Sequence, residues 1–279
     1  MRLIKSSFEI WEQSPGEIGI YKQIERAGRV CYKSEDRLTE DSYIRFVEML
    51  KSHAHGAMLE HGAVYLKIPI KEMEINHVIF NNKYSKITND DNYLYISTNY
   101  RVLVENNCED LLKYICEPTK SHERRVTVHF ITDRGVSHEY VRHRVFSFAQ
   151  ESTRYCNYSK NKFNNELAFI IPSWIEMEEG RITTDSFGCP TIVNEETYDF
   201  LSGLGASERS YFRLINREWT PQQARQVLPN ALKTELIMTG FISDWGHFFE
   251  LRCDQSAHPD ARALAIPLRD EFIKREFIE

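Results

Sequence analysis

The chain has 279 residues, 42% of them hydrophobic, which is enough to bury the core of one elaborated domain. Its formal net charge of −6 argues against a general nucleic-acid binder, because such binding comes from a broad basic surface. No window reaches the roughly 18 apolar residues of a membrane span, and the first residues lack the apolar stretch of a signal peptide. We therefore expect a cytoplasmic protein with one domain over residues 1–279 and with neither nucleic-acid nor membrane partners.

The first half of the sequence predicts two helices followed by strands. Glu17 to Val30 and Thr39 to Ala54 carry apolar residues at helical spacing. Ala63 to Ile70 and Arg125 to Ile131 alternate apolar and polar residues, which predicts half-buried strands. Between these strands we expect a polar stretch, a short strand and a short helix, at Asn81 to Asn92, Tyr93 to Ser97 and Glu109 to Cys116.

The second half of the sequence predicts more helix than strand. A helical pattern runs from Gly135 to about Arg144, and Pro172 ends a short strand over Leu167 to Ile171. Later elements are a β-compatible run at Lys233 to Phe241 and helices at Glu195 to Asn216, Pro221 to Leu228, Trp245 to Arg252 and Asp260 to Phe277. Because strands and helices do not alternate regularly, we predict a mixed α/β domain and no Rossmann sheet. Neither a GxGxxG nor a Walker sequence is present.

Six cysteines lie along the chain without the Cys-x-x-Cys spacing of zinc sites: Cys31, Cys108, Cys116, Cys156, Cys189 and Cys253. This pattern fits reduced thiols better than a disulfide framework, and we expect no bound metal.

The basic residues that stand out lie in the stretch RHRVFSFAQESTR, which covers Arg142 to Arg154. A guanidinium group offers a planar fork of donors suited to phosphate or to a carbonyl edge, and Ser152 adds a hydroxyl donor. A nucleotide pocket would use these groups. The alternative is that the Arg-His-Arg run is a solvated helix face with ordinary salt bridges.

The order of Arg142, His143 and Arg144, seven intervening residues, then Ser152 and Arg154 matches RHR(x)7SxR, and the chain thereby resembles the flavin-dependent thymidylate synthases, the ThyX family. Further elements occur in the order of that family. They are His55 with Glu60 and His61, the sequence ARQVLP at Ala224 to Pro229, and the sequence HFFELR at His247 to Arg252. The segment 71–122 stands outside the resemblance and is expected to be an insertion.

The resemblance implies a single domain of mixed α+β structure with a central, mostly antiparallel sheet flanked by helices. It also implies a reductive methylation of dUMP to dTMP. 5,10-Methylenetetrahydrofolate is the carbon donor, and FAD reduced by NADPH supplies the hydride. No cysteine of the enzyme attacks the pyrimidine in this family. Members are homotetramers whose sites are shared between subunits.

Residue by residue, the resemblance assigns Arg252 to catalysis, beside the uracil ring, where a fixed guanidinium stabilises developing charge. It assigns FAD contacts to Arg142, His143, Arg144, Gln150, His247 and His55. It assigns dUMP contacts to Glu139, Arg142, Gln150, Glu151, Ser152, Thr153, Arg154, Arg225 and Arg252. The blander alternatives are a surface charge for Arg225, a salt bridge with Asp254 or Glu250 for Arg252, and a core histidine for His247.

Three positions depart from the pattern of the family. Ala57 stands where many members have Thr or Ser, and Glu139 stands where Gln is common. Phe241 to Ser243 replaces an Asn-x-Arg pattern, so other side chains would make those FAD contacts.

Two other function classes remain open. A metal-dependent hydrolase could use His53, His55, Glu60 and His61 as ligands. An RNA- or nucleotide-binding module could combine the arginines of the motif with stacking by Phe146, Phe148 and Tyr155.

Overall fold

The computed structural model describes residues 1–53, 55–72, 77–182 and 194–279. Ala54, where the second predicted helix was to end, and Cys189 lie outside the described residues, as do residues 73–76 of the expected insertion. The strands are β1 (Arg2–Ile4), β2 (Ser7–Trp11), β3 (Ala63–Pro69), β4 (Lys86–Asn89), β5 (Tyr93–Asn99), β6 (Arg125–Asp133), β7 (Ser147–Gln150), β8 (Ala168–Ile170), β9 (Gly180–Arg181) and β10 (Lys233–Phe241). The helices are α1 (Gly16–Tyr32), α2 (Ser42–Ser52), α3 (Gly56–Leu59), α4 (Tyr100–Glu105), α5 (Arg134–Tyr140), α6 (Glu195–Asn216), α7 (Pro221–Ala224), α8 (Ile242–Arg252) and α9 (Pro259–Lys274).

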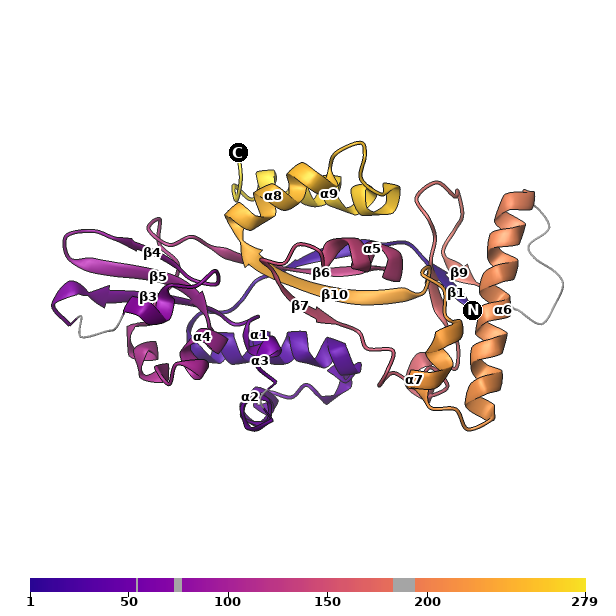
Figure 1. The fold of residues 1–279 in the computed structure, drawn as a ribbon, viewed down its shortest axis with the longest axis horizontal. Helices are drawn as coiled ribbons and strands as arrows, with labels where there is room; N and C mark the ends of the chain where they lie inside the picture. Colours follow the sequence, from indigo (N-terminus) through magenta and orange to yellow (C-terminus); the bar gives the residue numbers. More distant parts are fainter. Residues whose placement is uncertain (54, 73–76, 183–193) are drawn as a thin grey trace.

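A four-stranded antiparallel sheet in the order β2-β6-β10-β7 forms the centre of the molecule. Helices α5, α8 and α9 cover one face of it, and α1 covers the other (Figure 1). The alternation of side chains along β6 and β10 explains both contacts, because successive residues point to opposite faces. Val128, Phe130 and Leu236 pack under α8 and α9, whereas Ile237 packs on α1.

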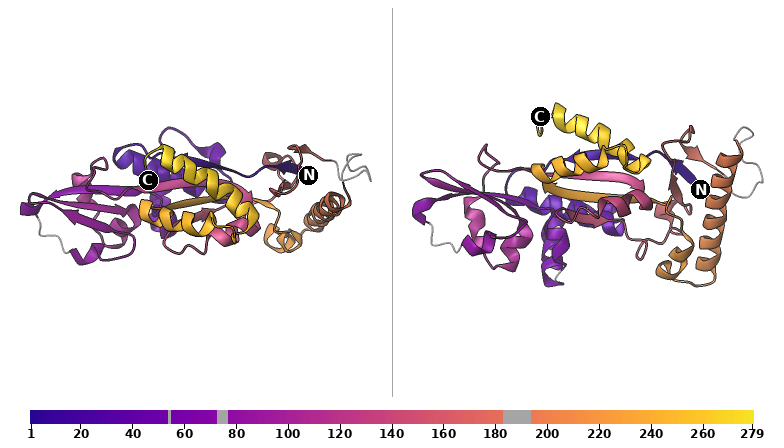
Figure 2. Two further views of the ribbon diagram at one scale, coloured as in Figure 1. Left: turned by 90° about the horizontal axis from the view of Figure 1, so that it is seen from above. Right: turned by 45° about the horizontal axis from the view of Figure 1, so that its top comes forward.

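Two smaller sheets flank the central one (Figure 2). The sheet β3-β5-β4 packs with α1, α2 and α4 around one apolar cluster, and the sheet β8-β1-β9 packs with α6 around another. The predicted α+β class with a mostly antiparallel central sheet is confirmed. Strand β5 pairs with β3 over Ala63–Pro69, so the expected insertion shares a sheet with the rest of the chain. Its status as an insertion, like the single domain over 1–279, stays a prediction.

Helix ends follow local capping chemistry. The Asn194 side chain accepts a hydrogen bond from the Thr197 N–H at 2.8 Å, which starts α6 at the predicted residue. The Asp133 side chain does the same for Val136 at 2.8 Å and starts α5 directly after β6. No helix in the described parts of the chain is long and apolar enough to cross a membrane.

Several sequence predictions need correction. The helix predicted to reach Arg144 ends at Tyr140, and Pro221 to Leu228 is helical only to Ala224, followed by a 3₁₀ turn. The strands predicted to be half-buried, β3 and β6, are buried almost throughout. For β6 the reason is that helices cover both faces of the central sheet. The sequence analysis missed seven short strands and helices, namely β1, β2, β4, β7, β9, α3 and α4.

Candidate functional site

The Arg-His-Arg run lies in a turn between α5 and β7. The His143 N–H donates to the Tyr140 carbonyl at 3.1 Å, and the Phe146 N–H donates to the His143 carbonyl at 3.1 Å. The side chains of Arg142 and Arg144 are exposed, and neither has a carboxylate within ion-pair distance among the residues that the structure describes. A helix face held by salt bridges is therefore not what this run forms.

His143 turns inward from the same turn and meets Arg252, the last residue of α8. The Arg252 Nε–H donates to His143 Nε2 at 2.9 Å. The imidazole is buried, and burial, followed by the charge of Arg252 and by His247, lowers its pKa to about 4. His143 is thus neutral near pH 7, and its Nε2 lone pair accepts the hydrogen bond from Arg252.

Arg252 is also bound by Glu139 of α5. One terminal nitrogen donates to the Glu139 carboxylate and the other donates to its carbonyl oxygen, each at 2.7 Å. The alternative that the sequence analysis gave for Arg252 was an ion pair with Asp254 or Glu250, whereas its ion pair in the structure is with Glu139. A guanidinium has five N–H donors, so two donors remain for a ligand after these three bonds.

His247 lies five residues before Arg252 on α8. Its ring is 6.4 Å from the ring of His143, and its side chain is 64% exposed. Its Nδ1 lies 3.2 Å from Glu250. His247 is consequently no core histidine, and α8 brings it beside the Arg-His-Arg turn.

The second half of the motif, Ser152 to Arg154, follows the end of β7. The Ser152 N–H donates to the carbonyl of Cys31 at 3.0 Å, which fixes this segment to the end of α1. Arg225 donates to the Thr153 hydroxyl at 3.3 Å, so the two regions assigned to the dUMP phosphate are in contact. Arg154 is exposed and lies over the ring of Tyr155.

Two predicted contact residues have their polar groups engaged within the protein. The Gln150 amide donates to Ser137 at 2.9 Å and to Thr234 at 3.2 Å. The Glu151 carboxylate is 2% exposed and binds Lys233 and Tyr158, so its side chain is not free to contact a nucleotide.

His55 lines a basic cavity of about 640 Å³ beside the motif. The cavity lies between α2, the end of α1 and the segment after Arg154, and Tyr155 and His53 also line it. Its charged lining has one carboxylate, Asp36, and four cations: Arg29, Arg37, Lys160 and Lys162. This composition suits an anionic ligand with aromatic rings. Of the departures from the family pattern, Ala57 is exposed next to His55, whereas the Ser243 N–H is engaged with Glu123 at 3.2 Å.

Strand β7 separates the two halves of the motif. Its four residues lie within the seven-residue spacer, so the Arg-His-Arg turn precedes the strand and Ser152 follows it. No hydrogen bond or ion pair joins Arg252 to the residues from Ser152 to Arg154 within the described chain. The motif residues of one chain thus lie in two separate groups, which we call half-sites, one with Arg252 and the other with Arg225.

The residues of the two rival functions are placed differently from what those functions need. His61 is fully buried and its Nδ1 lies 2.8 Å from the Thr239 hydroxyl, whereas the exposed His53 lies 2.9 Å from the Met49 carbonyl. No group of three or more His, Cys, Asp or Glu that could hold a metal occurs among the described residues. Phe146 packs in the core under α8, which leaves Tyr155 as the exposed ring of the proposed stacking set.

The thiols lie in surroundings that suppress ionisation. Burial raises the pKa of Cys31 to about 11 and that of Cys156 to about 12. Since the thiolate is the nucleophilic form, neither side chain is activated.

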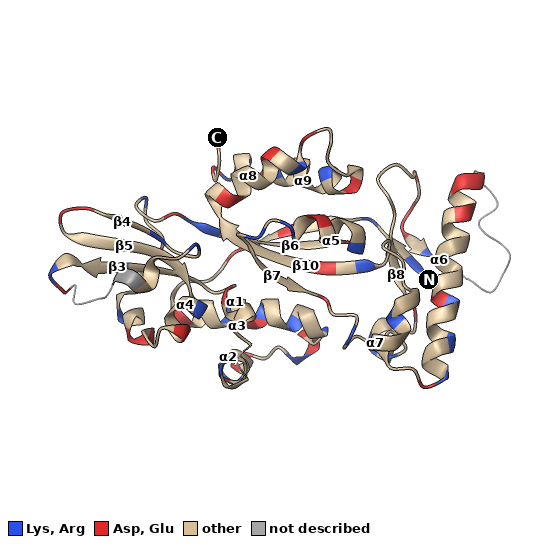
Figure 3. Ribbon diagram, viewed as in Figure 1, with Lys and Arg blue, Asp and Glu red and all other residues tan. Residues whose placement is uncertain are grey.

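The sequence analysis missed a group of buried charges behind Glu151. Lys233 and Glu235, at the start of β10, point to the face of the sheet that carries α1, where they meet Lys33 and His129. The start of β10 appears as adjacent blue and red segments in Figure 3. Two charged residues at alternate positions of an otherwise apolar strand were the available signal.

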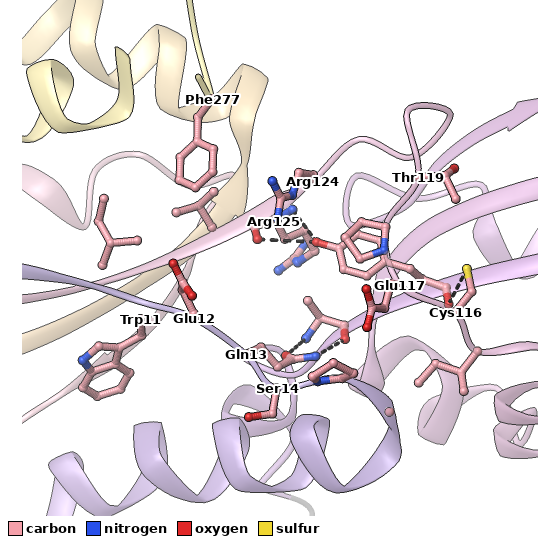
Figure 4. Close-up of a pocket in the computed structure, with 18 of the residues that line it drawn as sticks. Trp11, Glu12, Gln13, Ser14, Cys116, Glu117, Thr119, Arg124, Arg125 and Phe277 are labelled. Carbon is pink, nitrogen blue, oxygen red and sulfur yellow. Dashed lines mark hydrogen bonds between the residues drawn. The ribbon is translucent and has the colours of Figure 1, made fainter. Parts of the chain in front are cut away.

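A separate cavity of about 800 Å³ lies between the segment before α1, the start of β6 and the last residues (Figure 4). None of the predicted site residues lines it. Much of its polar lining is internally paired, since Gln13 exchanges two hydrogen bonds with Ala63 at 2.8 Å and Arg275 meets Glu12 at 3.1 Å. We assign it no function.

Comparison with known proteins links these observations to named families. The family model described as "Thymidylate synthase complementing protein" matches residues 93–275, more than half of the chain, and its match begins within the expected insertion. The flavin-dependent thymidylate synthase of Corynebacterium aurimucosum is 33% identical over 135 residues, which cover 48% of this chain and 51% of that protein. The namesake of Pyrococcus furiosus is 31% identical over 146 residues, 52% of each chain.

A solved structure, described as the UMP/dUMP methylase PolB from Streptomyces cacaoi bound with 5-Br dUMP, is 16% identical, with a TM-score of 0.46. The superposition covers 98% of this chain and 93% of the PolB chain. The chain spans about half the length of the curated relatives that it matches. The family match over residues 93–275 includes both the Arg-His-Arg turn and Arg252, and the chain belongs to the thymidylate synthase complementing protein family, the ThyX family that its motif indicated.

Proposed function

We propose that the protein is a flavin-dependent thymidylate synthase that methylates dUMP to dTMP. 5,10-Methylenetetrahydrofolate would donate the carbon, and FAD reduced by NADPH would donate the hydride. The observation that carries the proposal is the contact of His143 with Arg252, because it joins two family motifs, 109 residues apart in sequence, in one polar group. We place the activity in the cytoplasm.

The exposed cations of the Arg-His-Arg turn fit FAD. Arg142 and Arg144 have no described carboxylate partner, so their guanidinium groups can bind the pyrophosphate without breaking an ion pair. His143, neutral and buried behind them, adds no charge at the flavin ring. His247, His55 and the backbone near Gln150 complete the proposed contacts. When bound, the flavin would supply the hydride of the reaction.

The segment from Ser152 to Arg154, with Arg225, fits the phosphate of dUMP. Arg154 is exposed and has no described carboxylate partner, and the Arg225 bond to Thr153 sets a second guanidinium beside it. Arg252 would hold the uracil edge with its two remaining donors. Because Glu139 and His143 fix the guanidinium before the substrate arrives, little reorganisation is needed as charge develops on the ring.

The separation of the half-sites by β7 supports a shared site. A second copy of the chain would bring its segment from Ser152 to Arg154 against the first copy's Arg252. We therefore propose that the enzyme is a homotetramer, the assembly that the family resemblance implies. Methylenetetrahydrofolate would enter from the side of the basic cavity that His55 lines.

Flavin binding by the purified protein tests the proposal. We expect oxidised-flavin absorbance in the purified protein, or its appearance on addition of FAD. The double variant Arg142→Glu and Arg144→Glu should lose this absorbance, and Arg217→Glu, which reverses an exposed arginine outside both half-sites, should keep it. A wild-type protein that is colourless and takes up no FAD would refute the proposed function.

A further inference from the structure

A buried ion network lies directly behind the segment assigned to the dUMP phosphate. The Glu235 carboxylate is in contact with the ammonium groups of both Lys33 and Lys233, and His129 Nε2 lies 3.0 Å from it. Lys233 also binds the Glu151 carboxylate at 2.8 Å. The four charged side chains lie on three separate parts of the chain, namely the end of α1, the end of β7 and the start of β10.

The side chains of the network are largely buried. The exposed fractions of the side chains are 16% for Lys33, 15% for Lys233, 10% for Glu235 and 2% for Glu151. Burial alone would raise the pKa of Glu235, but the bond from His129 and the charges of the two lysines outweigh it and hold that pKa well below the usual range. Lys33 also pairs with Glu35, a 39% exposed side chain, at 3.0 Å. Two cations therefore face two buried carboxylates and one partly exposed carboxylate, and loss of either lysine increases the excess of negative charge around Glu235.

Glu151 connects this network to the proposed phosphate segment. Its carboxylate accepts a hydrogen bond from the Tyr158 hydroxyl at 3.1 Å. This bond links Glu151 to Tyr158 and so closes the turn over residues 152–157. Inside this turn, the N–H groups of Tyr155 and Cys156 donate to the Ser152 carbonyl. The backbone of Glu151 is held as well, since its N–H donates to the Glu235 carbonyl at 2.9 Å.

Lys33 reaches the network from an unusual backbone conformation. It follows the last residue of α1 and has φ of 49°, in the left-handed region that a residue with a side chain rarely adopts. This geometry directs the ammonium group to Glu235 while the carbonyl of Lys33 accepts a hydrogen bond from Lys162 at 2.6 Å. The end of α1 is thereby tied both to the network and to the chain beyond the turn.

We propose that Lys33 and Lys233 are positioning residues that hold the segment from Ser152 to Arg154 in the conformation that binds the phosphate of dUMP. The inference rests on the proposed function, because it presupposes that this segment receives the phosphate. Neither lysine needs to touch the nucleotide. Their effect reaches it through Glu151 and the turn that Glu151 closes.

The variant Lys233→Ala tests this role by kinetics and by chemical rescue. We expect KM for dUMP to rise roughly tenfold, the size typical of residues that act on a site without touching its ligand, while kcat and flavin absorbance change little. A cavity of about 490 Å³ reaches Lys33, Lys233 and Glu151, so ethylammonium can enter the space left by the side chain. Added ethylammonium should lower KM for dUMP towards the wild-type value. The variant Lys33→Arg, which keeps a positive charge at that position, should have the wild-type KM for dUMP.

The control is Lys51→Ala. Lys51 is also a partly buried lysine with two glutamate partners, Glu48 and Glu109, but it lies on α2 outside the network. This variant should leave KM for dUMP unchanged and should not respond to ethylammonium. Should Lys233→Ala fail to fold, Lys33→Ala gives a second test, because it also removes a cation from Glu235 and in addition frees Glu35.

Hydrogen exchange separates this proposal from the proposed function. Amides of residues 152–157 should exchange faster in Lys233→Ala than in the wild type, and ethylammonium should slow them again. If the wild type binds no dUMP but the exchange result holds, the reaction assignment fails and the control of the turn stands. Unchanged exchange together with unchanged KM for dUMP would overturn the positioning role, as would a loss in kcat and flavin that ethylammonium does not restore.

Discussion

Replacement of Arg252 by alanine should separate catalysis from folding. The change removes three hydrogen bonds, one to His143 and two to Glu139. His143 is 8% exposed, so leaving its Nε2 without a donor should lower the free energy of unfolding by about 1–3 kcal/mol. The Glu139 side chain is 46% exposed, and water can replace its lost partner at little cost.

The catalytic loss should be larger than this structural loss. Removal of one fixed donor that stabilises charge in a transition state typically lowers kcat by about 10²–10³-fold. We expect a fall of that order in dTMP formation at saturating dUMP, with flavin still bound. The kcat of Arg252→Lys should lie between those of the wild type and of Arg252→Ala, because an ammonium group keeps the charge but cannot make all three hydrogen bonds. Wild-type kcat in Arg252→Ala, with urea unfolding confirming a folded protein, would refute the assigned role.

Three further predictions follow from the buried groups. Burial lowers the pKa of His61 to about 3 and that of His143 to about 4, so the unfolded chain takes up protons at these two residues at a higher pH than the folded chain does. The free energy of unfolding should therefore fall as the pH drops from about 6.5 towards 4. Urea unfolding should show this slope, and His61→Gln should reduce it. Gly240→Ala would set a methyl group 2.5 Å from the Phe146 ring and should lower flavin affinity and the free energy of unfolding by about 1–3 kcal/mol. The control Gly246→Ala meets no atom within 4 Å and should leave both unchanged. Equal flavin affinity in the two variants would contradict the link between Phe146 and the Arg-His-Arg turn. Alanine at any one of the six cysteines should preserve turnover, and a covalent dUMP–cysteine adduct detected by mass spectrometry would contradict the proposed chemistry.

Local signals predicted the long elements of the fold well. Helix α6 has the bounds that the sequence predicted, Glu195–Asn216, because an asparagine cap precedes a long amphipathic stretch. Strand β10 was likewise predicted from its continuous run of β-forming residues. The short strand β7 was missed because its four residues lie inside the ligand motif, and the helix before it was extended through Arg144 for the same reason.

The sequence indicated which residues to consider for the candidate site but not how they are arranged. The resemblance to family motifs indicated Arg142, Arg225 and Arg252, yet the contact of Arg252 with Glu139 and His143 depends on how α5 and α8 pack on the sheet. The Lys33–Glu235 pair joins residues 202 positions apart, so no local pattern announces it. Long-range ion pairs of this kind follow from the fold and can be assigned only when the fold is known.

The most direct measurement of the central claim is the conversion of dUMP by the purified wild-type protein. With dUMP, methylenetetrahydrofolate, FAD and NADPH present, we predict that dTMP and tetrahydrofolate form in equal amounts and that omission of FAD from flavin-free protein stops the reaction. Formation of dihydrofolate in place of tetrahydrofolate, dTMP formation that does not depend on flavin, or no dTMP from a folded protein with bound flavin would contradict the account.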